Sequence, residues 1–160
     1  MVGTTSGSAR RGGARWRSTP GTTFRSFTRS AQGKHDLSAF GPNGFLRAFR
    51  GAVSPTAQTN LRVESRYDTD DDTIVLTITN IGTVPSRVTV ANGYGHDRAV
   101  TRSLRPGESD RQRWHLKKSS GWYDLSVVAS TDPGFLRRLA GHLENGRDSV
   151  SDPAFGNGQS

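Results

Sequence analysis

A short signature occurs twice in this chain, and this repeat constrains the fold more than any other feature. The two copies read DLSAFGPNGFLRAFRG over 36–51 and DLSVVASTDPGFLRRLAG over 124–141. They share eight identical residues in the same order, and the later copy has two additional residues before its Gly-Phe-Leu-Arg run. The copies are about 90 residues apart, which is too long for solenoid repeats and suits a duplicated β-sandwich domain of about that size.

The positions of the two copies indicate how the chain is divided into domains. If the signature closes a domain of about 90 residues, the later copy ends a complete domain over 55–147 and the earlier copy ends a truncated one over 35–53. We therefore expect a C-terminal fragment of a longer protein, with a tail over 148–160. The apolar residues of the truncated copy are expected either to pack loosely on the second domain or to promote association through an exposed edge.

Short runs of alternating apolar and polar residues fill the predicted complete domain, as expected for half-buried strands. The clearest run is 73–80, where Ile74, Leu76 and Ile78 share one face. The expected strands lie at 60–67, 73–80, around 88–90, 98–104, 111–116, 122–129 and 135–143. Periodicity alone leaves the last element open between strand and helix, and strand is favoured because Gly141 weakens a helix. The pattern predicts an all-β fold, an immunoglobulin-like antiparallel β-sandwich.

The positive charge of the chain is concentrated in its first 34 residues. The net charge is +8, and residues 1–34 hold seven basic residues and no Asp or Glu, so the remainder is almost neutral. This segment is rich in Gly, Ser and Thr without any period, so we expect a disordered basic extension that is not native to the domain. A nucleic-acid-binding arm is disfavoured, and so is a twin-arginine signal, because no apolar region follows Arg10 and Arg11. No nucleic-acid partner is expected.

Residue types that carry catalysis are sparse in this chain. It has no cysteine, which excludes disulfides, thiolate zinc sites and a cysteine nucleophile. The acidic run at 68–72 could bind calcium through carboxylates, but it lacks EF-hand spacing, and a solvated hairpin turn is favoured. The histidines, which show no metal-ligand spacing, are His35, His96, His115 and His142. We assign no catalytic, cofactor or metal-binding residue and predict that the chain alone is inactive.

Aromatic and basic side chains near the second signature form a candidate binding surface. The candidates are Trp114, Trp122, Tyr123, Arg137 and Arg138. The three aromatic residues could line a ligand platform, but packing in the sandwich core or at its end is favoured. The two arginines, with Arg47 after the Phe-Leu pair of the first copy, could contact anionic lipid, but a position facing solvent on a strand is favoured.

Several motifs together resemble one known family. They are GPNGFLRAFRG (41–51), LTITNIG (76–82), RPGES (105–109), GWYDLSV (121–127), GFLRRLAGHLENG (134–146) and SVSDPAFG (149–156). Through them the chain is similar, over about 35–156, to the C-terminal domain of bacterial phosphocholine-type phospholipase C. The first motif resembles the end of a preceding tandem copy in those enzymes.

This resemblance implies a large N-terminal phosphoesterase domain followed by two small β-domains. In that family the phosphoesterase domain carries the nucleophile and metal ligands and cleaves phospholipid, and none of its catalytic motif can be placed here. The resemblance therefore implies a non-catalytic accessory domain, active in lipid catabolism only through its parent. It implies the phosphoesterase domain as partner, a phospholipid surface as a second candidate partner, and a secreted or periplasmic parent. The alternative is a free-standing lipid- or carbohydrate-binding module, and the sequence does not indicate where such a fragment is located.

Overall fold

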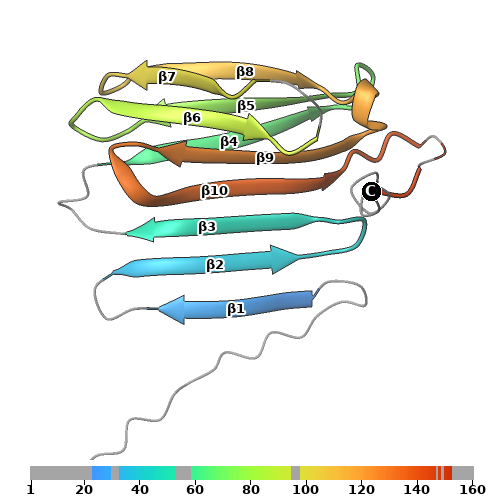
Figure 1. Cartoon of the computed structure of the whole chain (residues 1–160), viewed down its shortest axis with the longest axis horizontal. Helices are drawn as coiled ribbons and strands as arrows, with labels where there is room; N and C mark the ends of the chain where they lie inside the picture. Colours follow the sequence, from blue (N-terminus) through green and yellow to red (C-terminus); the bar gives the residue numbers. More distant parts are fainter. Residues whose placement is uncertain are drawn as a thin grey trace, which may run out of the picture.

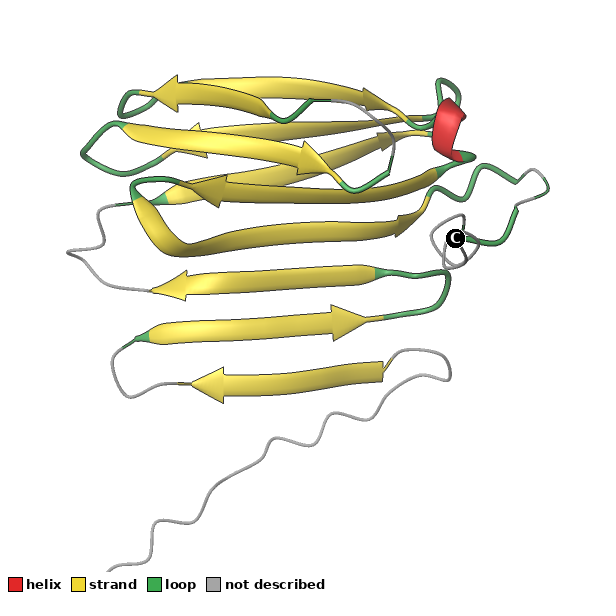
Figure 2. Cartoon of the chain, viewed as in Figure 1, coloured by secondary structure: helices red, strands yellow, loops and turns green. Residues whose placement is uncertain are grey.

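The chain folds almost wholly into antiparallel strands (Figure 1, Figure 2). The computed structural model describes residues 33–52, 59–94, 98–146, 148 and 150–152, together with the backbone of 23–29. Within these residues no helix has the length and apolar character needed to cross a lipid bilayer.

Ten strands and one short 3-10 helix make up the described structure. In chain order they are β1 (Thr23–Arg29), β2 (Lys34–Phe40), β3 (Leu46–Ala52), β4 (Leu61–Asp68), β5 (Thr73–Asn80), β6 (Ser86–Asn92), β7 (Val100–Leu104), β8 (Ser109–His115), η1 (Lys117–Ser119), β9 (Trp122–Ala129) and β10 (Asp132–His142).

The strands form two sheets, and these make a sandwich over part of their area. The large sheet has the order β1-β2-β3-β10-β9-β6-β7, and the small sheet has the order β4-β5-β8. The small sheet packs on the part of the large sheet formed by β10, β9, β6 and β7, whereas β1, β2 and β3 extend outward as a single layer (Figure 1). The predicted antiparallel β-sandwich is confirmed.

Alternation along the strands builds the core between the two sheets. In β5, Ile74, Leu76 and Ile78 point inward and are fully buried, and Leu125 and Val127 of β9 face them from the large sheet. The complete core cluster consists of Leu61, Ile74, Leu76, Ile78, Val88, Val90, Leu104, Trp114, Leu116, Tyr123, Leu125, Val127, Ala129, Phe135, Leu139 and Leu143. Burial of these apolar surfaces is the main term that holds the sheets together.

The two copies of the sequence signature form two hairpins with the same register. Asp36 pairs with Arg50 in β2–β3, and Asp124 pairs with Ala140 at the matching position of β9–β10. The hairpins also pair with each other, because β3 hydrogen-bonds to β10 along Leu46–Arg50. The segment predicted as the end of a separate domain is therefore continuous with the large sheet.

The seven strands predicted for 55–147 are all present, and the last of them, β10, is a strand rather than a helix. The N-terminal segment differs from its prediction, because Thr23–Arg29 of the segment predicted to be disordered forms β1. This strand pairs with β2 through main-chain groups, which do not require the side-chain periodicity on which the prediction relied. The rest of that prediction, at 1–22 and 30–32, lies outside the described residues, as does most of the predicted tail, at 153–160.

Candidate functional site

Two of the predicted aromatic residues lie in the core rather than on a surface. Trp114 of β8 and Tyr123 of β9 belong to the cluster between the sheets and are 7% and 3% exposed. The Tyr123 hydroxyl accepts a hydrogen bond from Arg47 Nη2 at 3.1 Å and lies 3.3 Å from the Tyr67 hydroxyl. Their burial agrees with the packing interpretation of these residues and does not leave them free as a ligand platform.

Trp122 lies on the opposite face of β9, at the end of the strand. Its ring packs at tilted angles against Tyr94 and His142, and its indole N–H donates to the Val150 carbonyl at 3.0 Å. The turn before β3 approaches the same ring closely, since a Cβ added to Gly44 would lie 2.8 Å from it. The φ of Gly44 is also positive, at 66°, so both contact and backbone require glycine here. Trp122 therefore anchors the outer face rather than presenting an open aromatic surface.

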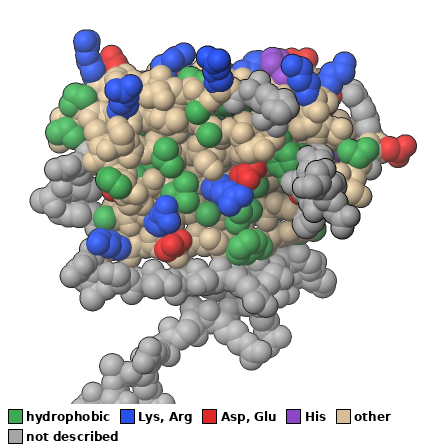
Figure 3. All heavy atoms as spheres, in the orientation of Figure 1, with side chains coloured by type: hydrophobic (Ala, Val, Ile, Leu, Met, Phe, Trp, Pro, Cys, Tyr) green, Lys and Arg blue, Asp and Glu red, His purple; other side chains and the backbone are tan. Residues whose placement is uncertain are grey.

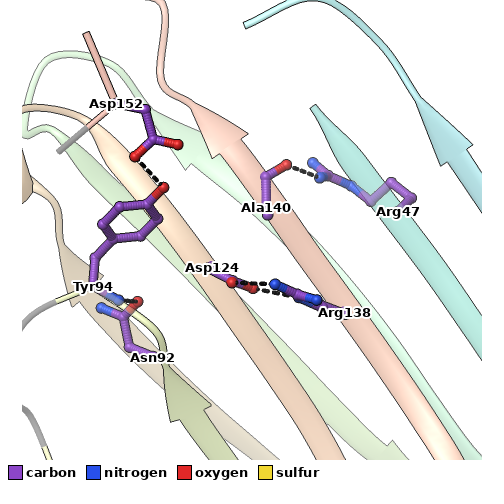
Figure 4. Close-up of polar contacts among 7 residues, drawn as sticks. All are labelled: Arg47, Asn92, Tyr94, Asp124, Arg138, Ala140 and Asp152. Atoms are coloured by element: carbon purple, nitrogen blue, oxygen red, sulfur yellow. Dashed lines mark hydrogen bonds and ion pairs between the residues drawn. The ribbon is translucent and has the colours of Figure 1, made fainter. Parts of the chain in front are cut away.

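Arg138 also lies on the outer face, where it forms a bidentate ion pair with Asp124 (Figure 4). Its Nε and Nη2 donate to the two carboxylate oxygens at 2.8 and 2.6 Å. The hydrogen bond to Asp124 raises the pKa of Arg138 above its ordinary value. Because Asp124 already occupies this guanidinium, a lipid phosphate would have to displace a short charge-assisted contact.

Tyr94 belongs to the same outer-face network. Its hydroxyl donates to Asp152 Oδ1 at 2.6 Å, and its own backbone N–H donates to Asn92 Oδ1 at 3.1 Å (Figure 4). Burial and the contact with Asp152 raise the pKa of the Tyr94 phenol well above its usual range. The contact ties the segment after β10 to the end of β6.

Arg137 lies on the inner face, and Arg47 matches it across the junction between β3 and β10. Arg47 stacks on Phe45 and Arg137 stacks on Phe135, each with 4.4 Å between the guanidinium carbon and the ring centroid. Arg47 Nη1 donates to the Ala140 carbonyl at 3.0 Å, and Arg137 Nη1 donates to the Arg50 carbonyl at 2.7 Å. Each Nη1 also donates to the carbonyl of its own preceding residue. Burial lowers the pKa of Arg137.

Arg47 makes further contacts through its Nη2 atom. Arg47 Nη2 donates to the hydroxyls of Tyr123 and Tyr67, and Tyr67 comes from β4 of the small sheet. Arg47 therefore connects the two layers at the edge of the sandwich. Burial, together with the hydrogen bond between Tyr123 and Tyr67, raises the pKa of Tyr123 to about 12.

The polar groups considered as metal ligands serve structural roles where the structure describes them. The acidic run forms the turn between β4 and β5, as predicted, and there Asp71 lies 3.7 Å from Arg113 and Asp72 accepts from Asn145. His115 lies 3.3 Å from the Thr73 hydroxyl, and His96 lies outside the described residues. Nowhere in the described ranges do three His, Asp or Glu side chains gather closely enough to hold a metal ion.

A basic groove lies along the edge formed by β7 and β8. It has a volume of about 1020 Å³. Its lining includes the basic residues Arg98, Arg102, Arg111, Arg113, Lys117 and Lys118. Lys and Arg side chains gather along this edge (Figure 3). The candidate residues of the sequence do not include these positions, apart from Trp114, which lines the groove from below.

The five candidate residues of the sequence do not converge on one site. Trp114 lies in the small sheet, Tyr123 and Arg137 lie on the inner face of the large sheet, and Trp122 and Arg138 lie on its outer face. The prediction of a lipid contact by the two arginines is not tested by this placement. Sequence reasoning missed Tyr67, and it considered Arg47 only for lipid contact and not for its link to the second sheet.

Comparison with known proteins gives a consistent result. A model of the family described as "Bacterial phospholipase C, C-terminal domain" matches residues 61–142. The chain is 43% identical over 121 residues to a non-hemolytic phospholipase C of Burkholderia pseudomallei, covering 74% of the chain and 17% of that protein. It is 41% identical over 127 residues to a hemolytic phospholipase C of Pseudomonas aeruginosa, covering 77% and 17%. A non-hemolytic phospholipase C of P. aeruginosa is 36% identical over 142 residues, covering 83% and 20%. The chain thus spans at most a fifth of the length of these relatives.

Proposed function

This chain belongs to the bacterial phospholipase C C-terminal domain family, and from that membership we propose that it is a non-catalytic accessory domain of a phospholipase C. Hydrolysis of phospholipid is then carried out by a separate phosphoesterase domain, which is the partner of this domain. The parent enzyme acts in lipid catabolism and is secreted or periplasmic.

The observation that supports this proposal most is where the family match begins and ends. The matched segment, 61–142, starts at the first residue of β4 and stops at the last residue of β10. The family model therefore covers the β4 to β10 unit, which contains the sandwich core of inward-facing apolar residues. Two polar pairs on the outer face are engaged within the domain, since Arg138 contacts Asp124 and Tyr94 contacts Asp152.

Turnover of a chromogenic phosphocholine ester by the purified full chain tests the proposal. We expect no rate above buffer, with or without added Zn²⁺ or Ca²⁺, because phosphoester cleavage needs an activated nucleophile and stabilisation of the developing charge. A full-length phospholipase C of the family serves as the positive control. Activity that co-purifies with the chain and is lost on His115→Ala would contradict the proposal.

The basic groove on β7 and β8 favours a second function, binding to an anionic phospholipid surface. Its guanidinium and ammonium groups are exposed and outnumber the carboxylates of Asp71 and Asp110 in the same lining. A surface with this excess of positive charge attracts anionic head groups over about a Debye length. This function can coexist with the accessory role.

Co-sedimentation of the full chain with phosphatidylserine-containing vesicles tests this second function. We expect binding that weakens with salt and that falls severalfold in Arg111→Glu/Lys118→Glu. The matched control is Arg66→Glu/Arg87→Glu, which makes the same change of charge on exposed strand positions outside the groove. An equal loss in both variants would show that net charge, and not the groove, determines binding.

A further inference from the structure

The two signature hairpins are related by a two-fold rotation. In the pairing of β3 with β10, Ala48 lies opposite Arg138, and these two residues occupy equivalent positions in the repeat. In the repeat, Leu46 matches Leu136 and Arg50 matches Ala140. The pairing joins Arg50 to Leu136 and Leu46 to Ala140, so a two-fold rotation converts one pair into the other. Antiparallel strands paired in this way are related by an axis perpendicular to the sheet, here between Ala48 and Arg138.

The equivalence continues beyond the hairpins. Gly33 and Gly121, which precede β2 and β9, occupy equivalent positions and have φ values of 73° and 86°. The strand β1 pairs with β2 antiparallel, as β6 pairs with β9. The order β1-β2-β3 therefore repeats the order β6-β9-β10 about the axis.

A rotation about an axis perpendicular to a sheet leaves each face of the sheet on the same side. The face of β2–β3 that corresponds to the core face of β9–β10 therefore points to the side on which the small sheet lies. In β10, Phe135 and Leu139 are covered by the small sheet and are 4% and 8% exposed. Their counterparts in the first hairpin, Phe45 and Phe49, are 38% and 41% exposed. Within the described residues, the inner face of β2–β3 thus carries the counterparts of core residues without a second sheet over them.

Arg137 indicates what kind of layer fits this face. Its counterpart Arg47 makes the same stacking and carbonyl contacts and, in addition, donates to Tyr67 from the covering strand β4. Among the described residues, no covering strand reaches Arg137. In the repeat, His35 stands where Tyr123 does, so His35 is the residue that lies near Arg137 as Tyr123 lies near Arg47. The Nδ1 atom of His35 is buried without a hydrogen-bond partner in the described part of the chain.

We propose that the inner face of β2–β3 is the docking surface for the three-stranded sheet of a second copy of this domain, whose first strand presents a tyrosine hydroxyl to Arg137 as Tyr67 does to Arg47. The two copies then share one continuous large sheet, joined through their last strands. A second molecule of this chain cannot supply the covering sheet, because its own β4-β5-β8 sheet already covers its β9 and β10. The covering sheet must therefore belong to a separate copy of the domain. The proposal stands on the internal repeat and does not depend on the accessory role proposed above.

A chimeric chain tests the proposal directly. In the chimera, a second copy of residues 59–120 replaces residues 1–32 and is joined to Gly33. This copy contains the strands of a second small sheet and precedes β2, just as β4, β5 and β8 precede β9 in the natural chain. Because the chain has no cysteine, Phe49→Cys gives a single thiol on the inner face. We expect its labelling rate to fall at least about tenfold in the chimera relative to the same substitution in the natural chain, since labelling would require local opening. Phe40→Cys is the matched control, because Phe40 is similarly exposed, at 44%, on the opposite face, and its labelling should not change.

The tyrosine contact is tested in the same chimera. Replacing the inserted copy of Tyr67 by Phe should restore part of the labelling at position 49, and Arg137→Met should do the same. A folded chimera in which the thiol of the Phe49→Cys variant reacts as fast as in the natural chain would overturn the proposal. So would a protection that is insensitive to both substitutions.

The natural chain provides an arm that does not depend on the folding of the chimera. Protection of the thiol in its Phe49→Cys variant by phosphatidylcholine or phosphatidylserine vesicles would identify a lipid surface as the occupant and overturn the proposal. Protection that grows with protein concentration would identify a second molecule of the chain and overturn it as well. Labelling that neither vesicles nor concentration changes supports the docking of a separate covering sheet.

Discussion

The hairpins β2–β3 and β9–β10 share a signature, a register and a turn glycine, yet only one of them is buried. Leu125 in β9 is fully buried beneath the small sheet, whereas its counterpart Leu37 in β2 is only partly buried. The same short sequence is therefore sufficient for the hairpin in both places, because its hydrogen bonds and cross-strand pairs are local. Burial depends on the second layer, which the signature does not contain.

The largest difference between the hairpins should appear when the same leucine is truncated in each. Leu125→Ala removes a side chain from the centre of the core and should lower the free energy of unfolding by about 2–5 kcal/mol. Leu37→Ala removes the equivalent side chain, which is only partly buried and which neither described sheet covers, so a loss below about 1 kcal/mol is expected. Denaturant unfolding of both variants measures the two losses. Equal losses would mean that the first hairpin is packed as tightly as the second.

A second comparison uses the glycine that ends each signature. A Cβ at Gly141 would lie 3.1 Å from the Tyr123 hydroxyl and 3.4 Å from the Phe45 Cα, whereas at Gly51 the nearest atom would be in the His35 ring at 3.5 Å. The φ values, 152° and 159°, are similar, so the backbone cost of alanine is shared. We expect Gly141→Ala to lose about 1–3 kcal/mol more than Gly51→Ala in the same unfolding measurement. No difference between the variants would indicate that the junction relaxes around the added methyl group.

The matched arginines separate the contacts that both hairpins make from those that depend on the second layer. Arg47→Met and Arg137→Met each remove two carbonyl contacts and a stacking contact. Only Arg47→Met also removes the guanidinium donor of the buried Tyr123 hydroxyl, so it should cost about 1–2 kcal/mol more. A double variant with Tyr123→Phe checks this, because the cost of Arg47→Met should decrease once the hydroxyl that accepts from Arg47 is gone. Equal losses in the free energy of unfolding for the two single variants would contradict the role of Arg47 in connecting the layers.

Much of this architecture is predictable from the sequence, and what is not predictable has physical causes. The alternation in 73–80 and 122–129 predicts both strands and their inward faces, because apolar burial and strand periodicity act together there. The repeat predicts that 36–51 and 124–141 resemble each other, and they do, down to the register. The strand β1 is not predictable in this way, because it is formed by main-chain pairing at a sheet edge.

The candidate site was less predictable than the fold. Residue type favours packing of the aromatic residues in the core but does not say on which face each one lies. Strand alternation places Tyr123 on the inner face and Trp122 on the outer face. The repeat aligns Arg47 with Arg137, so the contacts that they share could be expected to match. The contact of Tyr67 could not be expected, because it joins strands that are distant in sequence and lie in different sheets.

Alkaline pH should lower the free energy of unfolding through Tyr123, which lies where β4 of the small sheet covers the large sheet. The pKa of Tyr123 is raised to about 12 by burial and by its hydrogen bond with Tyr67, so the folded state favours the neutral phenol. This contribution to stability is complete below about pH 10 and is lost as pH rises from there to about 12, with about 1.4 kcal/mol at stake for each pKa unit. Unfolding curves at pH 9, 10 and 11 should show this decline, and Tyr123→Phe should make it shallower. Tyr94, whose pKa is also raised, contributes in the same direction, so the measured quantity is the difference between the natural chain and the variant.

The smallest expected difference concerns the aspartate that begins each signature. Asp124 holds Arg138 in a bidentate pair, but the residue that matches Arg138 in the first hairpin is Ala48, so Asp36 has no equivalent arginine. The side chain of Arg138 is 45% exposed, and solvent screening therefore keeps the pair weak. Asp124→Asn should cost about 0.5–1 kcal/mol, and Asp36→Asn should change stability by less than that.

Salt distinguishes this ion pair from a packing effect. The loss caused by Asp124→Asn should shrink when unfolding is measured in about 1 M salt, because the Debye length there falls to about 3 Å. A loss that persists unchanged at high salt would assign the contribution of Asp124 to short-range contacts of its side chain, which lies against the loop at Gly93, rather than to its charge interaction with Arg138. An equal cost for Asp36→Asn would show that the aspartate stabilises the hairpin by itself, without the arginine that only the second copy provides.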